Sequence, residues 1–311
     1  MSAEIVLSVR NLSKLFDGKP PVKAVDGISF QLAKGEVLGL LGLNGAGKTT
    51  TIQMLMGTLT YTSGSIHYFG QDFLKHRKDI LRRVVFASTY ASLPWLLTIE
   101  QNLKVFGRLA GLSGLMINER ADPLLERFGI LDKKKKPVSS LSSGQITRLM
   151  LVKAFLPMPD IVLLDEPTAS LDPDMAQDVL AFLQGERKKR GLSILFASHR
   201  MDEVSELCDR VIFLHKGQIV ADDKPEILAR SVSRYKLRLH VGDGLKRSMS
   251  LAEKMQLSFA VNERVIEVTL DEGQIPTFLM ALGQAGVFYS SIKILEPSLE
   301  DYFLMMARKK S

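Results

Sequence analysis

The stretch that decides the fold reads Gly42-Leu43-Asn44-Gly45-Ala46-Gly47-Lys48-Thr49. It fits the spacing G-x-x-x-x-G-K-S/T at every fixed position. An apolar run over residues 36–42 precedes it and predicts a strand, and residues 48–56 follow it and predict a helix. A strand, a glycine-rich loop and a helix in this order predict a phosphate-binding loop. The alternative is a glycine-rich turn that holds no ligand.

The residue types in this loop suit an anionic ligand. Its glycines let the backbone turn tightly and leave room for a bound group. The inward-facing amides and the positive end of the following helix then attract anionic oxygens. Lys48 adds a full positive charge for the terminal phosphates, and the Thr49 hydroxyl is a hard oxygen ligand of the kind that Mg²⁺ prefers. These groups predict a nucleoside triphosphate without fixing the reaction.

A second segment, Ile161-Val162-Leu163-Leu164-Asp165-Glu166, places two acids after four apolar residues. A buried parallel strand that delivers carboxylates at its carboxyl end has this pattern. We expect Asp165 to hold Mg²⁺ through water and Glu166 to orient the attacking water as a general base. The alternative is an ordinary strand that ends in acids at a loop.

Three further segments are unremarkable when taken singly. Ser142-Ser143-Gly144-Gln145 precedes an apolar-periodic helix, for which Ser142 is a good N-cap. Ser170-Leu171-Asp172 trails the two acids, and His199 ends another apolar strand. Alone, these segments are also what a serine-glycine turn, a helix cap and a strand-end histidine look like. Their order and spacing along the chain make the set specific.

In that order the segments resemble those of the ATP-binding subunits of ABC transporters, over residues 5 to about 225. The resemblance implies an α/β fold, the P-loop NTPase fold of ABC-type ATPases with an inserted helical subdomain. It implies ATP contacts from Phe16, which would stack on adenine, and from Gly42, Asn44, Gly45, Ala46, Gly47, Lys48, Thr49 and Thr50. It also implies ATP contacts from the signature residues Ser142, Ser143, Gly144 and Gln145, and from Asp172 in the D-loop.

The resemblance further implies catalytic roles for Glu166 and His199, with His199 on the γ-phosphate, and a magnesium site formed by Thr49, Asp165 and Thr89. Such subunits bind ATP as a head-to-tail dimer, in which the signature of one copy faces the phosphate loop of the other. A signature helix whose N-terminus lies far along the chain from the phosphate loop fits that arrangement.

Two positions depart from the family pattern. Ser143 stands where a glycine is usual, and a side chain there would cost about 1–2 kcal/mol if the backbone needed a positive φ. We expect a negative φ, which makes the change nearly free. An ungapped alignment back from residues 97–103 puts Thr89 where a glutamine usually opens the Q-loop. Because its hydroxyl reaches roughly 2–3 Å less, either water or Ser88 would have to fill the gap. Slow hydrolysis is therefore expected, and Thr89→Gln is expected to speed it.

Composition restricts the class of protein. The chain of 311 residues has 46% hydrophobic and 24% charged residues, which is typical of soluble proteins. No apolar run approaches the ~20 residues of a membrane-spanning helix, and no signal peptide is expected. The single cysteine, Cys208, is expected in a helix, as a small residue of the core. The protein itself is expected at the cytoplasmic face of the membrane.

The net charge of +7 includes one cluster, Lys133 to Lys136, next to Pro137. It is either a solvated loop or a group drawn to an anionic membrane surface. The cluster has no interleaved aromatic residues, so no nucleic-acid partner is expected.

Two domains are expected along the chain: an ATPase domain over residues 1–228, with its helical subdomain at about 88–155, and an accessory domain over residues 229–311. In the accessory domain the pattern predicts strands at 235–240, 257–261, 265–270 and 287–295 and helices at 244–255, 275–282 and 298–308. This order favours a small ferredoxin-like α+β domain, which could pack the dimer, sense a ligand or only stabilise the chain.

Residues 296–304 resemble the C-terminal tail of ATPase subunits that serve type-2 exporters with separate six-helix permeases, and Pro297 fits the first position of the last helix. The permease of such relatives docks beside the Q-loop, which corresponds to Tyr90–Leu97 here. That apolar stretch holds the only tryptophan, Trp95, and exposed apolar patches tend to mark interfaces. Alternatively, Trp95 and Leu97 belong to the subdomain core.

The expected function is an ATP-binding and ATP-hydrolysing subunit that powers export through a separately encoded membrane permease. A regulatory subunit with slow hydrolysis is the alternative, because Thr89 is not a glutamine. A soluble ABC ATPase that acts on ribosomes or DNA is less favoured, since this chain has one motif set, no sustained heptads and one cysteine. The transported substrate is not encoded in these motifs.

Overall fold

The computed structural model describes residues 4–88, 93–232 and 234–308. The chain forms two compact units, Met1–Lys224 and Pro225–Ser311. The division lies four residues before the expected one at 228/229, because helix α8 (Pro225–Arg230) contacts helix α11 (Leu299–Arg308) in the second unit.

The central sheet of the first unit has six strands in the order β10-β9-β3-β8-β7-β6. Five are parallel, and the edge strand β10 runs antiparallel to β9. The strands are β3 (Val37–Gly42), β6 (Val84–Ser88), β7 (Ile161–Asp165), β8 (Ser193–Ala197), β9 (Arg210–His215) and β10 (Gln218–Asp223). Every residue of β3, β7 and β8 is buried, as their continuous apolar runs predict. The carboxyl ends of the parallel strands share one edge, where such sheets bind ligands.

A second, antiparallel sheet has the order β2-β1-β4-β5. Its strands are β1 (Ile5–Phe16), β2 (Val22–Ala33), β4 (Ser63–Tyr68) and β5 (Gln71–Asp72). Leu7 and Leu12 of β1 share one buried apolar cluster with Leu40 of β3 and Ile52 of helix α1 (Lys48–Leu55). This common core fixes the antiparallel sheet against the first helix after the phosphate loop.

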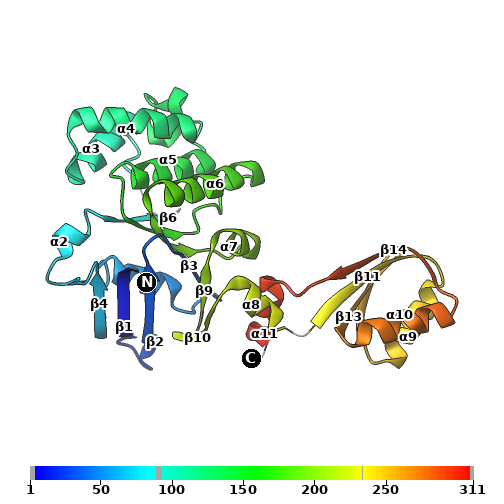
Figure 1. Ribbon diagram of the computed structural model, residues 1–311. Coiled ribbons are helices and arrows are strands. Elements are labelled where there is room, and N and C mark those ends of the chain that lie inside the picture. The colour runs from blue at the N-terminus through cyan, green and yellow to red at the C-terminus, as the bar shows by residue number, and fades with distance from the viewer. Residues whose placement is uncertain (1–3, 89–92, 233, 309–311) are drawn as a thin grey trace. The chain divides into compact units, whose positions relative to one another are not determined.

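Several helices gather at one end of the first unit, on the far side from the antiparallel sheet (Figure 1). Helix α3 (Ile99–Leu109) contacts both α4 (Gly114–Arg127) and α5 (Ser143–Phe155). Three rings pack edge to face in this region, with Phe182 between Phe128 and Phe155. The remaining helices of the unit are α2 (Arg77–Ile80), α6 (Pro173–Arg190) and α7 (Met201–Leu207), and two 3₁₀ turns lie at Leu131–Lys133 and Val138–Ser140.

The second unit confirms the ferredoxin-like expectation. Its elements are β11 (Arg234–Asp243), α9 (Leu245–Lys254), β12 (Ser258–Asn262), β13 (Val265–Asp271), α10 (Gln274–Gln284) and β14 (Phe288–Leu295). The sheet order β12-β13-β11-β14 is the split β-α-β arrangement. Leu237, Val268 and Phe278 form part of its own fully buried core.

Two local expectations were wrong. Helix α11 begins at Leu299, so Pro297 is not its first residue; the Ser298 hydroxyl instead accepts a hydrogen bond from the Asp301 amide at 3.2 Å. Cys208 is buried as expected, but it lies just after α7 ends, in an extended conformation. Burial raises the pKa of its thiol.

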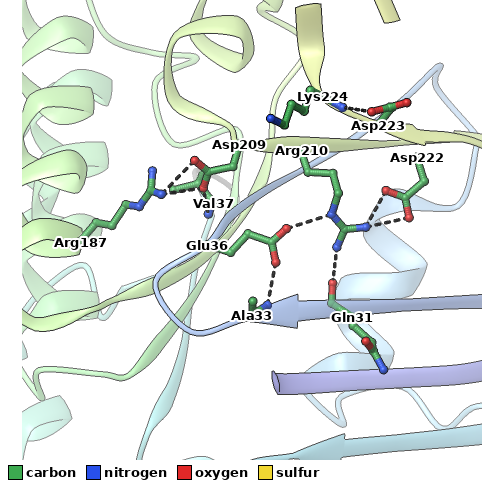
Figure 2. A network of polar contacts seen from close by, with 10 residues as sticks. All are labelled: Gln31, Ala33, Glu36, Val37, Arg187, Asp209, Arg210, Asp222, Asp223 and Lys224. Carbon is green, nitrogen blue, oxygen red and sulfur yellow. Dashed lines mark hydrogen bonds and ion pairs between the residues drawn. The ribbon is translucent and has the colours of Figure 1, made fainter. Parts of the chain in front are cut away.

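A polar network joins the two sheets of the first unit (Figure 2). Arg210 of β9 donates to the Glu36 carboxylate at 2.9 Å, to Asp222 at 2.6 Å and to the Gln31 carbonyl at 2.6 Å. Glu36 in turn accepts from the Ala33 amide at 2.7 Å. Burial alone would lower the pKa of Arg210, but its contacts with Glu36 and Asp222 outweigh that effect and raise it.

In the described part of the chain, no helix combines the length and the apolar character needed to cross a membrane.

Candidate functional site

The loop between β3 and α1 has a backbone that only glycine suits at two positions. Gly42 has φ 153° and Gly47 has φ 105°. A Cβ atom would lie 2.4 Å from the Leu214 carbonyl oxygen at Gly42 and 2.5 Å from the Ala24 carbonyl oxygen at Gly47. Any side chain at these positions would therefore displace backbone, and the glycines allow α1 to begin immediately at Lys48.

Lys48 lies against this loop and in the field of two acids. Its ammonium group donates to the Gly42 carbonyl at 2.6 Å and to the Leu43 carbonyl at 3.3 Å. Burial lowers the pKa of Lys48, while the nearby charges of Glu166 and Asp165 act in the opposite direction. One partly buried cation thus faces two carboxylates that come from a distant part of the sequence.

The two acids differ in their surroundings. Asp165 is the last residue of β7 and is 7% exposed. Burial raises the pKa of Asp165, Glu166 adds to the rise, and Lys48 opposes it. Glu166 has φ 53°, a left-handed conformation that costs about 1–3 kcal/mol in a residue with a side chain. Its amide nevertheless donates to the Ala197 carbonyl at 2.9 Å, which fixes it at the sheet edge.

The structure brings Glu166 and His199 into direct contact. Glu166 Oε2 lies 2.7 Å from His199 Nδ1. The Glu166 side chain is 15% exposed and that of His199 is 68% exposed. An acid with little access to water therefore touches an imidazole that stands open to solvent at the edge of the sheet.

The predicted adenine contact, Phe16, is the last residue of β1 and is 40% exposed. It pairs with Val22 of β2, and Lys14 lies over its ring with Nζ 5.0 Å from the centroid. Ala24, two residues after Val22, is the residue whose carbonyl would meet a Cβ at Gly47. The strand pair that carries this exposed ring thus reaches the start of α1.

The N-cap predicted for Ser142 is confirmed, and it forms a complete capping box. The Ser142 hydroxyl accepts from the Gln145 amide at 3.3 Å, and the Gln145 side chain accepts from the Ser142 amide at 3.0 Å. Ser143 is the first residue of α5 and is not among the residues with positive φ, so its backbone has the expected negative φ.

The D-loop segment packs on this helix. A Cβ at Gly144 would lie 3.2 Å from the Ser170 carbonyl oxygen. Asp172 caps α6 by accepting from the Met175 amide at 3.0 Å. The hydrogen bonds of Ser142 to Gln145 stay within α5 and its cap in the described part of the chain.

Thr89, the residue at the Q-loop position, lies outside the described residues, as do Tyr90, Ala91 and Ser92 of the expected permease contact. The residue before it, Ser88, ends β6 and pairs in register with Asp165. Its side chain is 5% exposed. Ser88 therefore sits at the strand end next to the buried acid.

The donor set suits magnesium. Asp165 and Glu166 bring two carboxylates to one edge near a single lysine, and Thr49 supplies a hydroxyl on α1. Among the described residues no group of three or more His, Cys, Asp or Glu side chains is arranged to hold a metal unaided. Mg²⁺ is commonly bound by one or two protein oxygens together with substrate phosphates and water. Thr49 and Asp165 fit a magnesium ion that takes its remaining ligands from the nucleotide phosphates and water.

Three polar residues that join segments of this site were not predicted from the sequence. Thr168 donates to Glu203 Oε2 at 2.6 Å, and Arg200 Nη1 lies 2.7 Å from Glu203 Oε1. A usable signal was present: Glu203 shares the buried face of α7 with Val204 and Leu207, and an acid on an apolar helix face is unusual.

The chain is similar to known proteins over most of its length. The ABC transporter family model matches residues 25–169. The bacitracin transport ATP-binding protein BcrA of Bacillus licheniformis is 30% identical over 303 residues, which cover 97% of this chain and 97% of that protein. The linearmycin resistance ATP-binding protein LnrL of Bacillus subtilis (strain 168) is 30% identical over 318 residues, covering 96% of this chain and 97% of that one.

A solved structure of the ATP-binding subunit of an ABC transporter aligns with a TM-score of 0.67 and 28% identity, over 73% of this chain and 92% of that chain. The relatives match along nearly their whole length and the solved structure matches in fold. The chain therefore belongs to the ATP-binding proteins of ABC transporters and is an ATPase of that family.

Proposed function

We propose that this chain is the ATP-hydrolysing motor of an exporter, acting as a head-to-tail pair on the cytoplasmic side of a separate membrane permease. The contact between Glu166 Oε2 and His199 Nδ1 at 2.7 Å is the observation that carries the hydrolytic part of the proposal. It places a carboxylate and an imidazole together at the sheet edge, within the electrostatic reach of Lys48.

The roles proposed for the residues follow from their positions. The loop amides and Lys48 bind the phosphates, and Phe16 stacks on the adenine. Glu166 orients the attacking water and accepts its proton, while His199, held through Nδ1, presents its other nitrogen to the terminal phosphate. Thr49 and Asp165 would hold a magnesium ion, whose charge offsets that of the phosphates when it is bound.

A second copy would complete the site. Helix α5 has 13 residues, and its N-terminus carries Ser142, Ser143 and Gly144, so that its amides favour an anionic oxygen. The D-loop residue Asp172 lies at the start of the neighbouring helix α6. We assign these residues to the ATP bound by the partner copy.

We assign the permease contact to Trp95 and Leu96, which belong to the predicted stretch Tyr90–Leu97 and lie among the described residues. Trp95 is 55% exposed and Leu96 is 89% exposed, which supports a surface role for Trp95 over the alternative of a core role, while Leu97 is half-buried. Asn102, itself 1% exposed, holds their loop by donating to the carbonyls of Pro94 at 3.2 Å, Leu97 at 3.2 Å and Thr98 at 3.1 Å. An exposed tryptophan on a hydrogen-bonded loop suits the role of an interface anchor, a role in which tryptophan is enriched.

The same loop is bonded to the chain that leads into the signature. The Ser139 amide donates to the Trp95 carbonyl at 3.0 Å, and the Val138 amide donates to the Leu97 carbonyl at 3.0 Å. Ser142 follows Ser139 by three residues. A permease that moved Trp95 would thus pull directly on the segment before the α5 cap, which is a route for coupling transport to hydrolysis.

The relatives indicate the class of cargo. BcrA is named for bacitracin transport and LnrL for linearmycin resistance, and both match this chain through its second unit. We propose an antibiotic-like natural product as the exported substrate. The alternative, a regulatory subunit with slow hydrolysis, still rests on Thr89.

A Glu166→Gln variant tests the hydrolytic role. We expect Mg-ATP turnover to fall on the order of 10²–10⁴-fold, while ATP binds and gathers two chains into a stable dimer measured by light scattering. Glu206→Gln, the same change at an exposed acid on α7, is the control and should turn over normally. Wild-type turnover by Glu166→Gln would refute the role.

A Trp95→Ala variant tests the permease contact. The permease should co-purify poorly with it, while ATP binding by the isolated subunit stays unchanged. Leu115→Ala serves as the control, because Leu115 is an apolar residue of α4 that is 71% exposed. Co-purification of Trp95→Ala at the wild-type level would exclude this surface.

A further inference from the structure

Glu203 is a buried carboxylate that none of the family motifs contains. It lies on α7 and is 1% exposed. Its Oε2 accepts a hydrogen bond from the Thr168 hydroxyl, with 2.6 Å between the two oxygens, and its Oε1 lies 2.7 Å from the Arg200 guanidinium. Thr168 is completely buried, and the Arg200 side chain is 30% exposed.

The two partners of Glu203 belong to the two segments that form the catalytic contact. Thr168 follows Glu166 by two residues, and Arg200 directly follows His199. Arg200 is further fixed because its amide donates to the Ser198 hydroxyl at 3.1 Å. The Glu203 carboxylate therefore links Thr168, two residues after Glu166, to Arg200, the residue directly after His199.

Stability alone does not explain an acid at this position. Burial raises the pKa of Glu203 against the opposing effects of Thr168 and Arg200, so its charge is held at an energetic cost. Its helix neighbours Val204 and Leu207 are buried and apolar. A buried ion pair can often be replaced as a whole by apolar residues without loss of stability. What the acid adds is a directed link between two particular segments.

We propose that Glu203 is a positioning residue for ATP hydrolysis, which holds the segments of Glu166 and His199 so that Glu166 Oε2 and His199 Nδ1 stay in contact. This inference rests on the roles proposed above for Glu166 and His199. Because small displacements of a catalytic group can cost about 10²-fold in rate, the link bears on turnover and not on the binding of ATP.

A Glu203→Leu variant separates positioning from stability, since leucine fills similar space without either contact. We expect Mg-ATP turnover by the folded variant to fall about 10- to 100-fold, with its affinity for ATP within about twofold. Its melting temperature should also fall, because the buried Thr168 hydroxyl and the Arg200 guanidinium lose their shared partner. A residue that merely supported the fold would lower the melting temperature and leave the turnover of the folded fraction unchanged. Glu206→Gln, on the exposed face of the same helix, should change none of them.

Thr168 supplies a second, independent test of the same link. Thr168→Val removes the hydroxyl at nearly constant volume and should also slow turnover, whereas Thr168→Ser keeps the hydroxyl and should restore most of it. In the double variant Thr168→Val with Glu203→Leu, the rate should fall no further than in the slower single variant, as expected for coupled neighbours.

The inference is overturned if folded Glu203→Leu turns over within twofold of the wild type, or if its turnover falls only together with its affinity for ATP. Should that variant fail to fold, normal turnover by Thr168→Val would overturn it instead. Glu166→Gln, measured in parallel, distinguishes a failure of the positioning role of Glu203 from a failure of the roles proposed for Glu166 and His199. If that variant is inactive and Glu203→Leu is normal, only the positioning role fails; if Glu166→Gln is normal, the proposed roles of Glu166 and His199 fail.

Discussion

Glu166 Oε2 and His199 Nδ1 lie 2.7 Å apart although the two residues are 33 positions apart in the chain. The sheet accounts for the contact. Strands β7 and β8 are parallel neighbours, with Asp165 paired to Ala197, so the residues that follow each strand emerge side by side. The left-handed turn at Glu166 then directs its carboxylate along the edge toward the histidine.

Removing the imidazole should impair hydrolysis more than binding. His199→Ala is expected to lower Mg-ATP turnover on the order of 10²-fold, as for the loss of one positioned polar group, with ATP affinity changed only severalfold. A coupled assay for phosphate release and calorimetric titration would measure the two quantities. His76→Ala removes an exposed imidazole before α2 and is the matched control. Equal losses of affinity and turnover in His199→Ala would contradict this account.

The buried charge of Asp165 should make the protein less stable at neutral pH than its neutral analogue. Because the folded-state pKa of Asp165 is raised above 3.8, stability falls as pH rises from 3.8 through the folded-state value. Asparagine cannot ionise, so Asp165→Asn should not lose folding stability in this way. Its melting temperature should exceed that of the wild type at pH 8, by roughly 2–4 °C for each kcal/mol of stability regained, and this difference should shrink toward pH 4.

Thermal melts of Asp165→Asn and the wild type between pH 4 and pH 8 would test this sign. Asp178→Asn, at an exposed acid on α6, is the control and should follow the wild type. An Asp165→Asn protein that is less stable at pH 8 would show that the carboxylate is held favourably, contrary to the expectation.

The serine in the signature should be almost neutral. Ser143 has a helical backbone at the first position of α5, so Ser143→Gly relieves no strain and turnover should stay within about twofold. Ser142→Ala, by comparison, removes a capping box worth about 1 kcal/mol and should lower the melting temperature. A large rise in ATPase rate for Ser143→Gly would mean that serine restrains the signature through its side chain.

The network around Arg210 should contribute to stability and leave nucleotide chemistry alone. Arg210→Met would leave Glu36 and Asp222 without their shared cation, and the loss of one partner of a part-buried charge costs about 1–3 kcal/mol. Chemical denaturation should show this loss, with ATP affinity unchanged. Lys34→Ala, which breaks an exposed pair with Glu4, should leave the unfolding midpoint where it is.

Elements with a strong local signal were predictable from the sequence. The run before Asp165 is a buried strand and Ser142 is a helix cap, because apolar continuity and capping chemistry act within a few residues. The order of elements in the second unit also follows from its alternating patterns. At the last helix, the pattern predicted Pro297 at the first helical position, whereas the helix begins at Leu299. The Ser298 hydroxyl accepts from the Asp301 amide three residues on, a capping signal that the prediction did not use.

Contacts between distant segments were not predictable in the same way. The link from Glu203 to Thr168 and Arg200 depends on how α7 packs against the segments that follow β7 and β8, and no local pattern encodes that packing. The same holds for the hydrogen bonds of Asn102 to the Trp95 loop, because the local sequence does not indicate that Asn102 is buried. The comparisons with relatives establish the family but not these contacts.

Calorimetric titration of ATP into the purified chain is the most direct test of the central claim, that the Gly42–Thr49 loop with Asp165 binds a magnesium nucleotide. The account predicts binding that requires Mg²⁺, that is abolished by Lys48→Ala, and that in the Glu166→Gln background is followed by association of two chains. Absence of magnesium-dependent binding by the folded wild-type protein would contradict it.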